Sequence, residues 1–286
     1  MLKIDNILLP NGLYIVSTPI GNLKDITIRA LSVLKNCDFI SCEDTRVTKK
    51  LLSKYQIKSK KLISLHKYSN QNKLIFLVNK IKEGKSIALV SDAGTPIISD
   101  PGLSLVILAI KEEINVFPIP GPTAIAASLV GSGLKSDNFF FVGFLPNKKN
   151  QRLNILKKIK KINSLLIFYE SPKRIRKTLN DMFLIFGDRK CVIARELTKY
   201  YETFYRGKLS KLKEINKDLK GEITIIMSPP EKEHVVEENK IDDEDMEKIS
   251  KFVENKLSKK DLSEILSIIY KKPKKFFYTK LIKSIR

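Results

Sequence analysis

The sequence has very few of the side chains that bind metals or form disulfides. Of its 286 residues, only three are Cys and two are His. Cys37, Cys42 and Cys191 lack the spacing of metal ligands, and only His66 and His234 are available to complete a site. We therefore expect no metal site and interpret the cysteines as buried or unreactive thiols.

Long apolar runs are absent as well. Although 43% of the residues are hydrophobic, no window of about 18 residues is apolar enough to span a bilayer. The first residues, MLKIDNILLPNGLYIV, contain no long apolar core followed by small residues, and so do not resemble a signal peptide. The sequence predicts a cytoplasmic protein without a transmembrane helix.

Two common nucleotide-binding motifs are also missing. Neither GxGxxG nor GxxxxGK[ST] follows a predicted strand, which argues against the usual phosphate cradles of dinucleotide-binding and P-loop proteins. The Gly-Ser-Gly at 131–133 comes late in a predicted helix, and we interpret it as the end of that helix.

Acidic residues are scarce relative to basic ones. The chain has 53 Lys and Arg against 31 Asp and Glu, a formal charge of +22. This excess favours polyanionic partners, nucleic acid above all, because each phosphate that is neutralised releases counterions. The charge is support and not proof, since Lys greatly outnumbers Arg and genome base composition alone produces such a pattern.

What is present is a regular alternation of strands and helices in residues 1–118. The predicted strands are 13–17, 38–43, 61–65, 86–90 and 115–119, and the predicted helices are 25–36, 44–55, 70–84 and 103–113. This alternation predicts a parallel sheet with helices on both faces, whose ligands bind at the carboxyl ends of the strands.

A Pro-Gly-Pro hinge within 118–129 marks the predicted start of a second α/β domain, 119–230. Its predicted strands are 138–145, 164–170, 190–196, 202–209 and 221–227, and its predicted helices are 147–162, 172–186 and 210–219. The composition then turns acidic, so 231–286 is predicted to be a solvated linker and a small helical appendage. In the appendage, Ser258 is a predicted N-cap and Pro273 opens a helix.

The stretch SDAGTPIISDPG, residues 91–102, places two Gly, two Pro and two Asp directly after a predicted strand. Gly94 and Gly102 permit a positive φ and a close backbone approach, while Asp92 and Asp100 can accept hydrogen bonds. An ordinary turn uses the same residue types.

Other predicted strand ends are decorated in a similar way. They are STPIGNLKDIT (17–27), SCEDTR (41–46), IPGPTA (119–124), FYESPKR (168–174) and ARELTKYYE (194–202). Taken as the strand ends of a doubly wound architecture, these motifs predict a composite cleft between the two domains.

These motifs, in this order and over roughly residues 13–227, resemble the ribosomal RNA-modifying branch of the tetrapyrrole methylase superfamily. The resemblance implies two α/β domains with S-adenosylmethionine in the cleft between them, and a homodimer. It also implies the reaction, 2′-O-methylation of a cytidine ribose in the decoding region of 16S rRNA in the small ribosomal subunit.

Carried over position by position, the resemblance implies ten cofactor-binding residues. They are Pro19, Asp92, Gly94, Thr95, Ile97, Ile98, Asp100, Thr123, Ala124 and Tyr169. The chemistry agrees with this set, because a sulfonium loses its positive charge on methyl transfer and is best held by carboxylates in a fixed, dry pocket.

The proton of the ribose hydroxyl needs an acceptor late in the transfer. The candidate catalytic residues are Glu43, Asp100 and Glu170. Glu43 is equally consistent with a surface acid next to Asp44, and Glu170 with an ion pair to Arg174 four residues on.

Basic side chains near the predicted cleft are the candidate RNA contacts. They are Arg29, Arg46, Lys49, Lys50, Lys173, Arg174, Arg176 and Arg195. PKRIRK (172–177) is the strongest of these groups because its cations open a helix, and Tyr200 and Tyr201 are candidates for stacking on a base.

Two alternatives stay open at this stage. The first is a small-molecule methyltransferase that acts on a tetrapyrrole, which the basic excess argues against without excluding an anionic macrocycle. The second is a non-catalytic RNA-binding scaffold, which predicts the loss of the cofactor loops, whereas 91–102 is intact.

Overall fold

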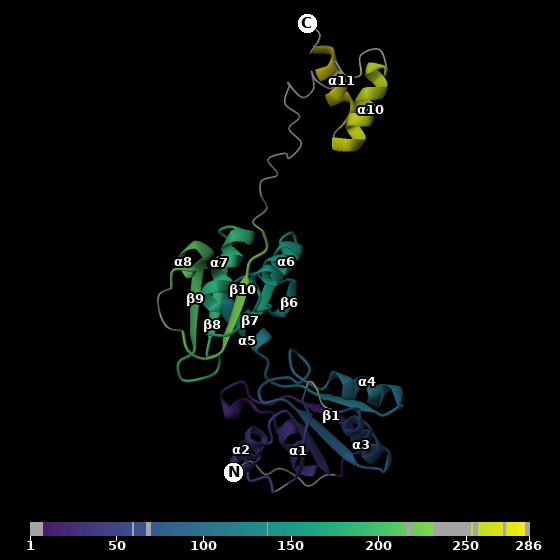
Figure 1. Cartoon of the computed structure of the whole chain (residues 1–286), viewed down its shortest axis with the longest axis vertical. Coiled ribbons are helices and arrows are strands. Elements are labelled where there is room, and N and C mark those ends of the chain that lie inside the picture. Colours follow the sequence, from purple (N-terminus) through teal and green to yellow (C-terminus); the bar gives the residue numbers. More distant parts are fainter. Residues whose placement is uncertain are drawn as a thin grey trace. The chain divides into compact units, whose positions relative to one another are not determined.

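The computed structural model describes residues 8–58, 60–66, 70–135, 137–215, 219–230, 253, 257–270 and 273–283. Their contacts divide the chain into two compact units, 1–230 and 231–286, which are described separately (Figure 1). Among the described residues, no helix is both long and apolar enough to cross a membrane.

The first sheet of the larger unit is parallel, as predicted. Its strands are β1 (Gly12–Val16), β2 (Phe39–Cys42), β3 (Lys61–Ser64), β4 (Ser86–Val90) and β5 (Val116–Ile119), in the order β3-β2-β4-β1-β5. All residues of β1 and β4 are buried, and such continuous apolar strands are typical of a sheet covered on both faces.

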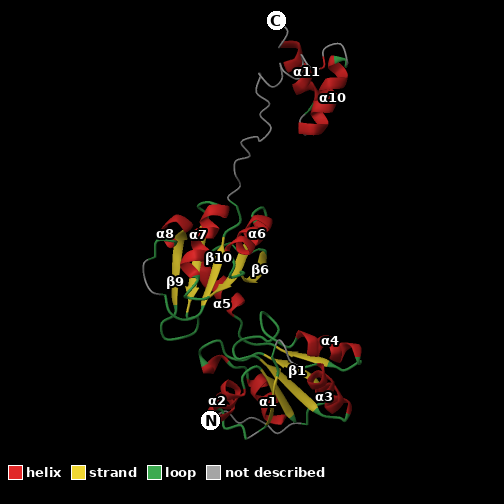
Figure 2. Ribbon diagram, in the orientation of Figure 1, coloured by secondary structure: helices red, strands yellow, loops and turns green. Residues whose placement is uncertain are grey.

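Helices cover both faces of this sheet (Figure 2). One apolar core joins α1 (Ile28–Asn36) and α2 (Thr45–Lys54) to Tyr14 and Val16 of β1. The opposite core joins α3 (Gln71–Lys82) and α4 (Leu103–Lys111) to Leu13 and Ile15. The alternation along β1 follows from the two-residue period of a strand.

The second sheet is mixed, so the expected doubly wound architecture is wrong for this half. Its strands are β6 (Phe139–Phe144), β7 (Leu165–Glu170), β8 (Lys190–Arg195), β9 (Thr203–Lys208) and β10 (Ile223–Met227), in the order β6-β7-β10-β8-β9. Only the β6–β7 pair is parallel. The loop from β8 to β9, residues 196–202, is too short for the crossover that parallel neighbours need, so these strands form a hairpin.

The antiparallel setting of β10 matters for the site. Its first residue, Ile223, pairs with Glu170 at the end of β7 and with Arg195 at the end of β8. The amino end of β10 therefore lies beside the carboxyl ends of its two neighbouring strands, β7 and β8.

The second sheet also has helices on both faces. α6 (Lys149–Ile159), α7 (Ile175–Phe186) and α8 (Leu209–Leu212) pack on one face. On the other face lies α5 (Ala124–Ser132), in a core that includes Ile20 from the loop after β1. α5 ends at Gly133 with a left-handed φ of 73°, which confirms the interpretation of the Gly-Ser-Gly. The predicted helix 210–219 is shorter than expected, and residues 216–218 lie outside the described residues.

The smaller unit contains α10 (Lys259–Tyr270) and α11 (Lys274–Lys283), which enclose a core of Leu262, Leu266, Phe277 and Leu281. The Ser258 hydroxyl accepts a hydrogen bond from the Asp261 backbone N–H at 3.1 Å, which confirms the predicted N-cap. Pro273 directly precedes α11, as predicted. The predicted acidic linker lies outside the described residues, and the domain boundaries at 118 and 230 stay predictions.

The three cysteines are buried free thiols, as the sequence predicts. Burial raises the pKa of Cys37 and of Cys191 to about 12, so both stay protonated and unreactive at neutral pH. Within the part of the chain that the structure describes, no group of three His, Cys, Asp or Glu side chains is arranged to hold a metal ion.

Candidate active site

The loops after β1, β4 and β5 are bonded to one another at the carboxyl edge of the first sheet. The backbone N–H of Thr18 donates to Gly94 O at 2.9 Å, and the N–H of Gly94 donates to Thr18 O at 3.0 Å. The Thr95 hydroxyl lies 2.9 Å from Ser17 Oγ and donates to Pro122 O at 3.2 Å. These bonds fix the central loop 91–102 between its neighbours.

The central loop has an unusual backbone. Gly94 and Gly102 take positive φ values of 79° and 124°, as the sequence suggests. Ile97 and Ser99 also have positive φ, at 76° and 72°. This conformation is strained for a β-branched residue such as Ile97, at a cost of roughly 1–3 kcal/mol, and such strain is concentrated at functional sites.

A pocket of about 320 Å³, the main pocket, opens beside the central loop. Its walls come from that loop, the start of α5, the end of β7 and the start of β10. The volume lies at the lower end of the roughly 300–1,000 Å³ that is usual for small-molecule sites.

Most of the predicted cofactor residues meet in the main pocket. The lining includes Gly94, Thr95, Ile98, Asp100, Thr123, Ala124 and Tyr169, together with the candidate base Glu170. Ile97 does not line it, because its side chain packs against the apolar core under β4 and α4.

Pro19 and Asp92 instead line an adjoining pocket of about 270 Å³. This adjoining pocket lies between the loop after β1, helix α2 and the start of the central loop, and it shares Ile20, Ala93 and Glu222 with the main pocket. Apart from Ile97, the predicted binding residues are thus divided between two neighbouring pockets.

Two carboxyl groups near the strand ends, Asp100 and Glu43, have a raised pKa. Burial raises the pKa of Asp100, and the nearby charge of Asp92 raises it further. The pKa of Glu43 is raised by burial and then by the charges of Asp92 and Asp100. Asp44 differs, since a hydrogen-bonded Arg46 lowers its pKa to about 2. Asp100 and Glu43 therefore hold a proton more readily than ordinary carboxyl groups do.

The Glu170 carboxylate is fully engaged by its own neighbours. One oxygen accepts the Ser171 N–H at 2.8 Å and lies 3.2 Å from Arg174 Nε. The other accepts the Thr178 hydroxyl at 2.5 Å. This arrangement favours the ion-pair alternative for Glu170 over the role of a proton acceptor.

Tyr169 forms part of an aromatic wall of the main pocket. Its ring lies edge-on to Phe141 and Phe144, with centroid distances of 5.0 and 5.5 Å. Burial, and then the charge of Asp100, raise the pKa of Tyr169 to about 12. Its phenol therefore stays protonated at neutral pH and remains a hydrogen-bond donor.

The predicted RNA contacts fall into two groups. Six remain exposed, namely Arg29, Arg46, Lys49, Lys50, Lys173 and Arg176, and Arg46 is paired with Asp44 at 2.6 Å. Arg174 is held by Glu170 and the Leu145 carbonyl instead.

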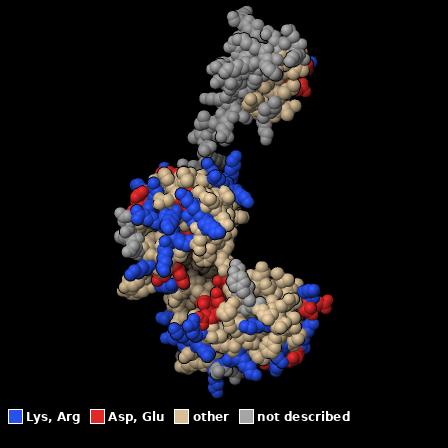
Figure 3. Space-filling view, viewed as in Figure 1, with Lys and Arg blue, Asp and Glu red and all other residues tan. Residues whose placement is uncertain are grey.

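The two candidates for stacking on a base, Tyr200 and Tyr201, are 93% and 66% exposed, and their rings meet edge to face. In Figure 3, basic side chains gather over the half that carries α6, α7 and α8.

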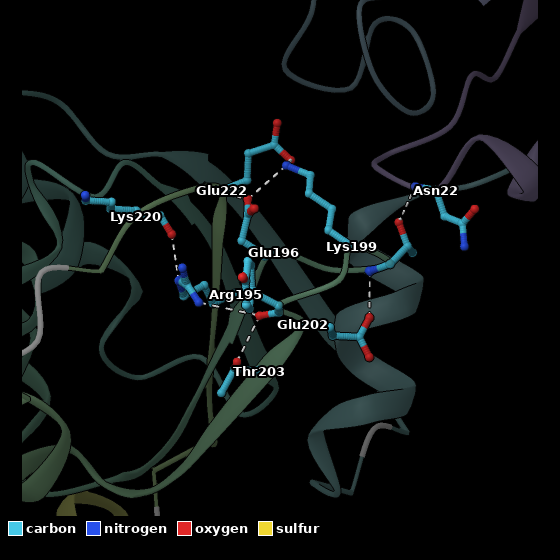
Figure 4. Close-up of polar contacts among 10 residues, drawn as sticks. Asn22, Arg195, Glu196, Lys199, Glu202, Thr203, Lys220 and Glu222 are labelled. Carbon is cyan, nitrogen blue, oxygen red and sulfur yellow. Dashed lines mark hydrogen bonds and ion pairs between the residues drawn. The ribbon is translucent and has the colours of Figure 1, made fainter. Parts of the chain in front are cut away.

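The loop between β8 and β9 is stiffened by polar contacts (Figure 4). Lys199 Nζ lies 2.9 Å from Glu196 Oε1 and 3.1 Å from Glu222 Oε2. The Thr198 hydroxyl accepts the Asn22 N–H at 2.9 Å, which ties this loop to the loop after β1. Glu196 and Thr198 both have positive φ, at 51° and 65°.

Arg195, the eighth predicted RNA contact, also has internal partners (Figure 4). Its Nε donates to the Lys220 carbonyl at 2.6 Å, and its Nη1 donates to the Tyr201 carbonyl at 3.5 Å. Arg195 therefore joins the turn before β10 to the loop after β8.

One wall of the main pocket consists of residues that were not among the predicted site residues. Gly221, Glu222, Ile223 and Thr224 line it from the start of β10. A search of carboxyl ends alone overlooks them, because an antiparallel strand brings its amino end to the same edge. The short β8–β9 connection signals an antiparallel hairpin in this sheet, but it does not give the direction of β10.

The fold is that of a known family. Residues 12–213 match the family described as Tetrapyrrole (Corrin/Porphyrin) Methylases. The crystal structure of diphthine synthase superposes with a TM-score of 0.61 at 16% identity, covering 76% of this chain and 89% of that one. Uroporphyrin-III C-methyl transferase from Thermus thermophilus, complexed with S-adenyl homocysteine, gives 0.55 at 15% identity, covering 76% and 97%. The chain belongs to the tetrapyrrole methylase family.

Within this family, the chain is similar to proteins named Ribosomal RNA small subunit methyltransferase I. The relative from Halalkalibacterium halodurans is 50% identical over 217 residues, which are 75% of this chain and 75% of the relative. The relative from Thermotoga maritima is 48% identical over 222 residues, 77% of this chain and 99% of the relative. The resemblance seen in the sequence motifs is confirmed.

Proposed function

We propose that this protein methylates the 2′ oxygen of a cytidine ribose in the decoding region of 16S rRNA, using S-adenosylmethionine. Methylation of small-subunit ribosomal RNA is the activity in the names of relatives that are 43–50% identical to this chain. The observation that carries the proposal is the main pocket, which keeps Asp100, Thr123 and Tyr169 together at the joined strand ends. An rRNA substrate agrees with a cytoplasmic protein.

The main pocket fits S-adenosylmethionine, which is the cofactor of this family. Its lining combines a carboxylate, Asp100, with apolar side chains such as Ile20 and Ile98. The carboxylate suits a cationic sulfur, and the apolar side chains suit an adenine ring and a methylene chain. Gly94 keeps the central loop close to the pocket, since an added Cβ would lie 3.2 Å from Ile20 Cγ2.

When bound, S-adenosylmethionine supplies a methyl group on a cationic sulfur, and its transfer to a ribose oxygen leaves the neutral thioether and releases the hydroxyl proton. Asp100 is the proposed acceptor of that proton at its carboxylate, because it lines the main pocket and its pKa is raised. Glu43 is the second candidate, with a pKa raised through the same group of carboxylates. Tyr169 and Phe144 give the pocket an aromatic wall.

The adjoining pocket is the proposed entrance for the acceptor nucleotide. It shares a wall with the main pocket and carries Asp92, Lys50 and Lys199. Asp92 accepts the Asp44 N–H at 3.0 Å, which fixes its carboxylate at this entrance. The exposed Tyr200 and Tyr201 are the proposed stacking surface for a neighbouring base.

A homodimer is also part of the proposal. Leu103, Ile107 and Ile110 form an exposed apolar stripe on α4, with 55–63% of each side chain accessible. Phe139 and Phe140 of the edge strand β6 are about half exposed as well. Apolar side chains grouped in this way mark an association surface more often than a free one.

The test combines calorimetry with methyl transfer. S-adenosylmethionine is titrated into the protein, and tritium from its methyl group is then followed into 30S subunits from a strain that lacks this modification. Nuclease mapping that places the label on one cytidine ribose supports the proposal. Cofactor binding without any labelled rRNA contradicts the proposed substrate, and the absence of cofactor binding contradicts the enzyme.

A further inference from the structure

A third concave surface, the basic groove, lies beside the main pocket. Its volume is about 660 Å³, and it is lined by residues within 171–179 together with residues 213, 215 and 219–221. Ser171, Pro172 and Gly221 line both the basic groove and the main pocket. The two hollows therefore share a wall.

The charged side chains that line the basic groove are all cationic. They are Lys173, Arg176, Lys213 and Lys220. Lys173, Arg176 and Lys220 are exposed, and among the described residues none of these three forms an ion pair. The floor between them is apolar and includes Ile175 and Leu179. Such a surface offers several positive charges to a ligand that brings several negative ones.

Contacts within the chain fix residues that line the basic groove. Arg195 Nε donates to the Lys220 carbonyl at 2.6 Å (Figure 4). Lys213 Nζ lies 4.2 Å from the centroid of the Phe183 ring of α7. A binding surface that is fixed in advance loses less entropy when its partner docks.

We propose that the basic groove binds the sugar–phosphate backbone of the RNA strand that flanks the methylated nucleotide. This inference rests on the proposed function. A small anion needs one or two cations, whereas Lys173, Arg176, Lys213 and Lys220 surround a hollow larger than the main pocket. Proteins that bind single strands use a positively charged groove of this kind to follow the backbone. The shared wall leads the strand from the basic groove to the main pocket.

The experiment compares two variants of equal charge change in the full-length protein. The groove variant carries Lys173→Gln, Arg176→Gln and Lys220→Gln. The control variant carries Lys149→Gln, Lys157→Gln and Lys158→Gln, which are exposed on α6 of the same half. Fluorescence anisotropy with a labelled fragment of 16S rRNA gives the affinity at several salt concentrations, and calorimetry gives the affinity for S-adenosylmethionine.

We expect the groove variant to bind the RNA at least about tenfold more weakly. We also expect the slope of log affinity against log salt concentration to become shallower by about 2, since each phosphate contact on a single strand contributes roughly 0.7 to that slope. The control variant is expected to keep the wild-type slope within about 0.5, and both variants to bind the cofactor normally. Equal weakening in both variants, or none in the groove variant, would overturn the inference.

Methyl transfer to 30S subunits separates this inference from the proposed function. If the wild type transfers no methyl group but the groove variant alone loses RNA affinity, the proposed substrate is wrong and the groove still binds RNA. If the wild type methylates 30S subunits and the groove variant has the same KM for them as the control, the groove inference is wrong and the function stands.

Discussion

Thr18 and Gly94 exchange two backbone hydrogen bonds, of 2.9 and 3.0 Å, although 75 residues separate them in the chain. This short antiparallel bridge joins the loops that follow two neighbouring parallel strands, β1 and β4. It fixes the position from which the central loop turns along the main pocket. The geometry of the main pocket, the proposed cofactor site, therefore depends on the backbone at Gly94.

We predict that Gly94→Ala weakens cofactor binding by about tenfold or more, equivalent to about 1.4 kcal/mol. Gly94 has a φ of 79°, and its new Cβ would lie 3.2 Å from Ile20 Cγ2 in the pocket wall. Calorimetry with S-adenosylmethionine measures the loss.

The matched control is Gly84→Ala, because Gly84 has a φ of 86° with nothing within 4 Å of a Cβ. Both substitutions are expected to lower stability by about 1–2 kcal/mol through backbone strain. Only the Gly94 variant is expected to lose affinity, and an equal loss in both variants would show that the effect is general destabilisation.

The second prediction concerns the pH dependence of cofactor binding. Burial, and next the charge of Asp92, hold the pKa of Asp100 above its usual value of 3.8. A cation in the main pocket favours the ionised carboxylate, so affinity should fall as the pH drops through the raised pKa and should level off above it. Asp100→Asn should flatten this profile and bind about tenfold more weakly at neutral pH, a loss of about 1.4 kcal/mol.

The stability of the folded protein should depend on pH in the opposite direction to its affinity for the cofactor. Because the pKa of Asp100 is raised by folding, its contribution to stability is full below the pKa of the unfolded chain and is lost as the pH rises through the folded value. Asp100→Asn should therefore keep or raise the melting temperature at neutral pH, and the exposed Asp137→Asn should change neither property. A lower melting temperature for Asp100→Asn would contradict this account.

The third prediction separates two of the candidate bases. Glu170→Gln removes the charge that faces Arg174 and disturbs the bonds to Ser171 and Thr178. We expect a loss of about 2 kcal/mol and a melting temperature lower by roughly 4–8 °C. Thermal unfolding monitored by circular dichroism measures it.

Glu43→Gln is the comparison. Burial and the charges of Asp92 and Asp100 raise the pKa of Glu43, so its neutral isostere should leave the melting temperature unchanged or raise it. If Glu170→Gln instead abolishes methyl transfer at an unchanged melting temperature, then Glu170 takes part in the chemistry and the ion-pair interpretation is wrong.

The fourth prediction concerns the dimer. Ile107 is 58% exposed on α4, within the apolar stripe, and Ile107→Glu should shift the protein from dimer to monomer in sedimentation velocity. Leu184→Glu on α7 is the control, since Leu184 is 68% exposed but lies outside the stripe. A wild-type protein that sediments as a monomer would contradict the proposed dimer. A control variant that dissociates as readily as Ile107→Glu would contradict the role of the apolar stripe on α4.

Local patterns in the sequence predict most strands and helices of the fold and the chemistry of the central loop. Strands such as β1 and β4 are continuous apolar runs because both of their faces are buried, and this pattern is local. The glycines of 91–102 are required where the backbone needs a positive φ, which a sequence also reveals. One of the motifs that carry the family resemblance, SDAGTPIISDPG, is this same loop.

Which side chains line the same pocket, and which have hydrogen-bond or ion-pair partners within the chain, follows only from the tertiary structure. β10 contributes a wall of the main pocket only because it runs antiparallel to β7 and β8. Both carboxylate oxygens of Glu170 accept hydrogen bonds. Lys220 and Arg176 line the same basic groove although 44 positions separate them in the chain. Local patterns set the conformation of a segment, whereas strand direction and long-range packing set its neighbours, and no single segment of the sequence encodes these.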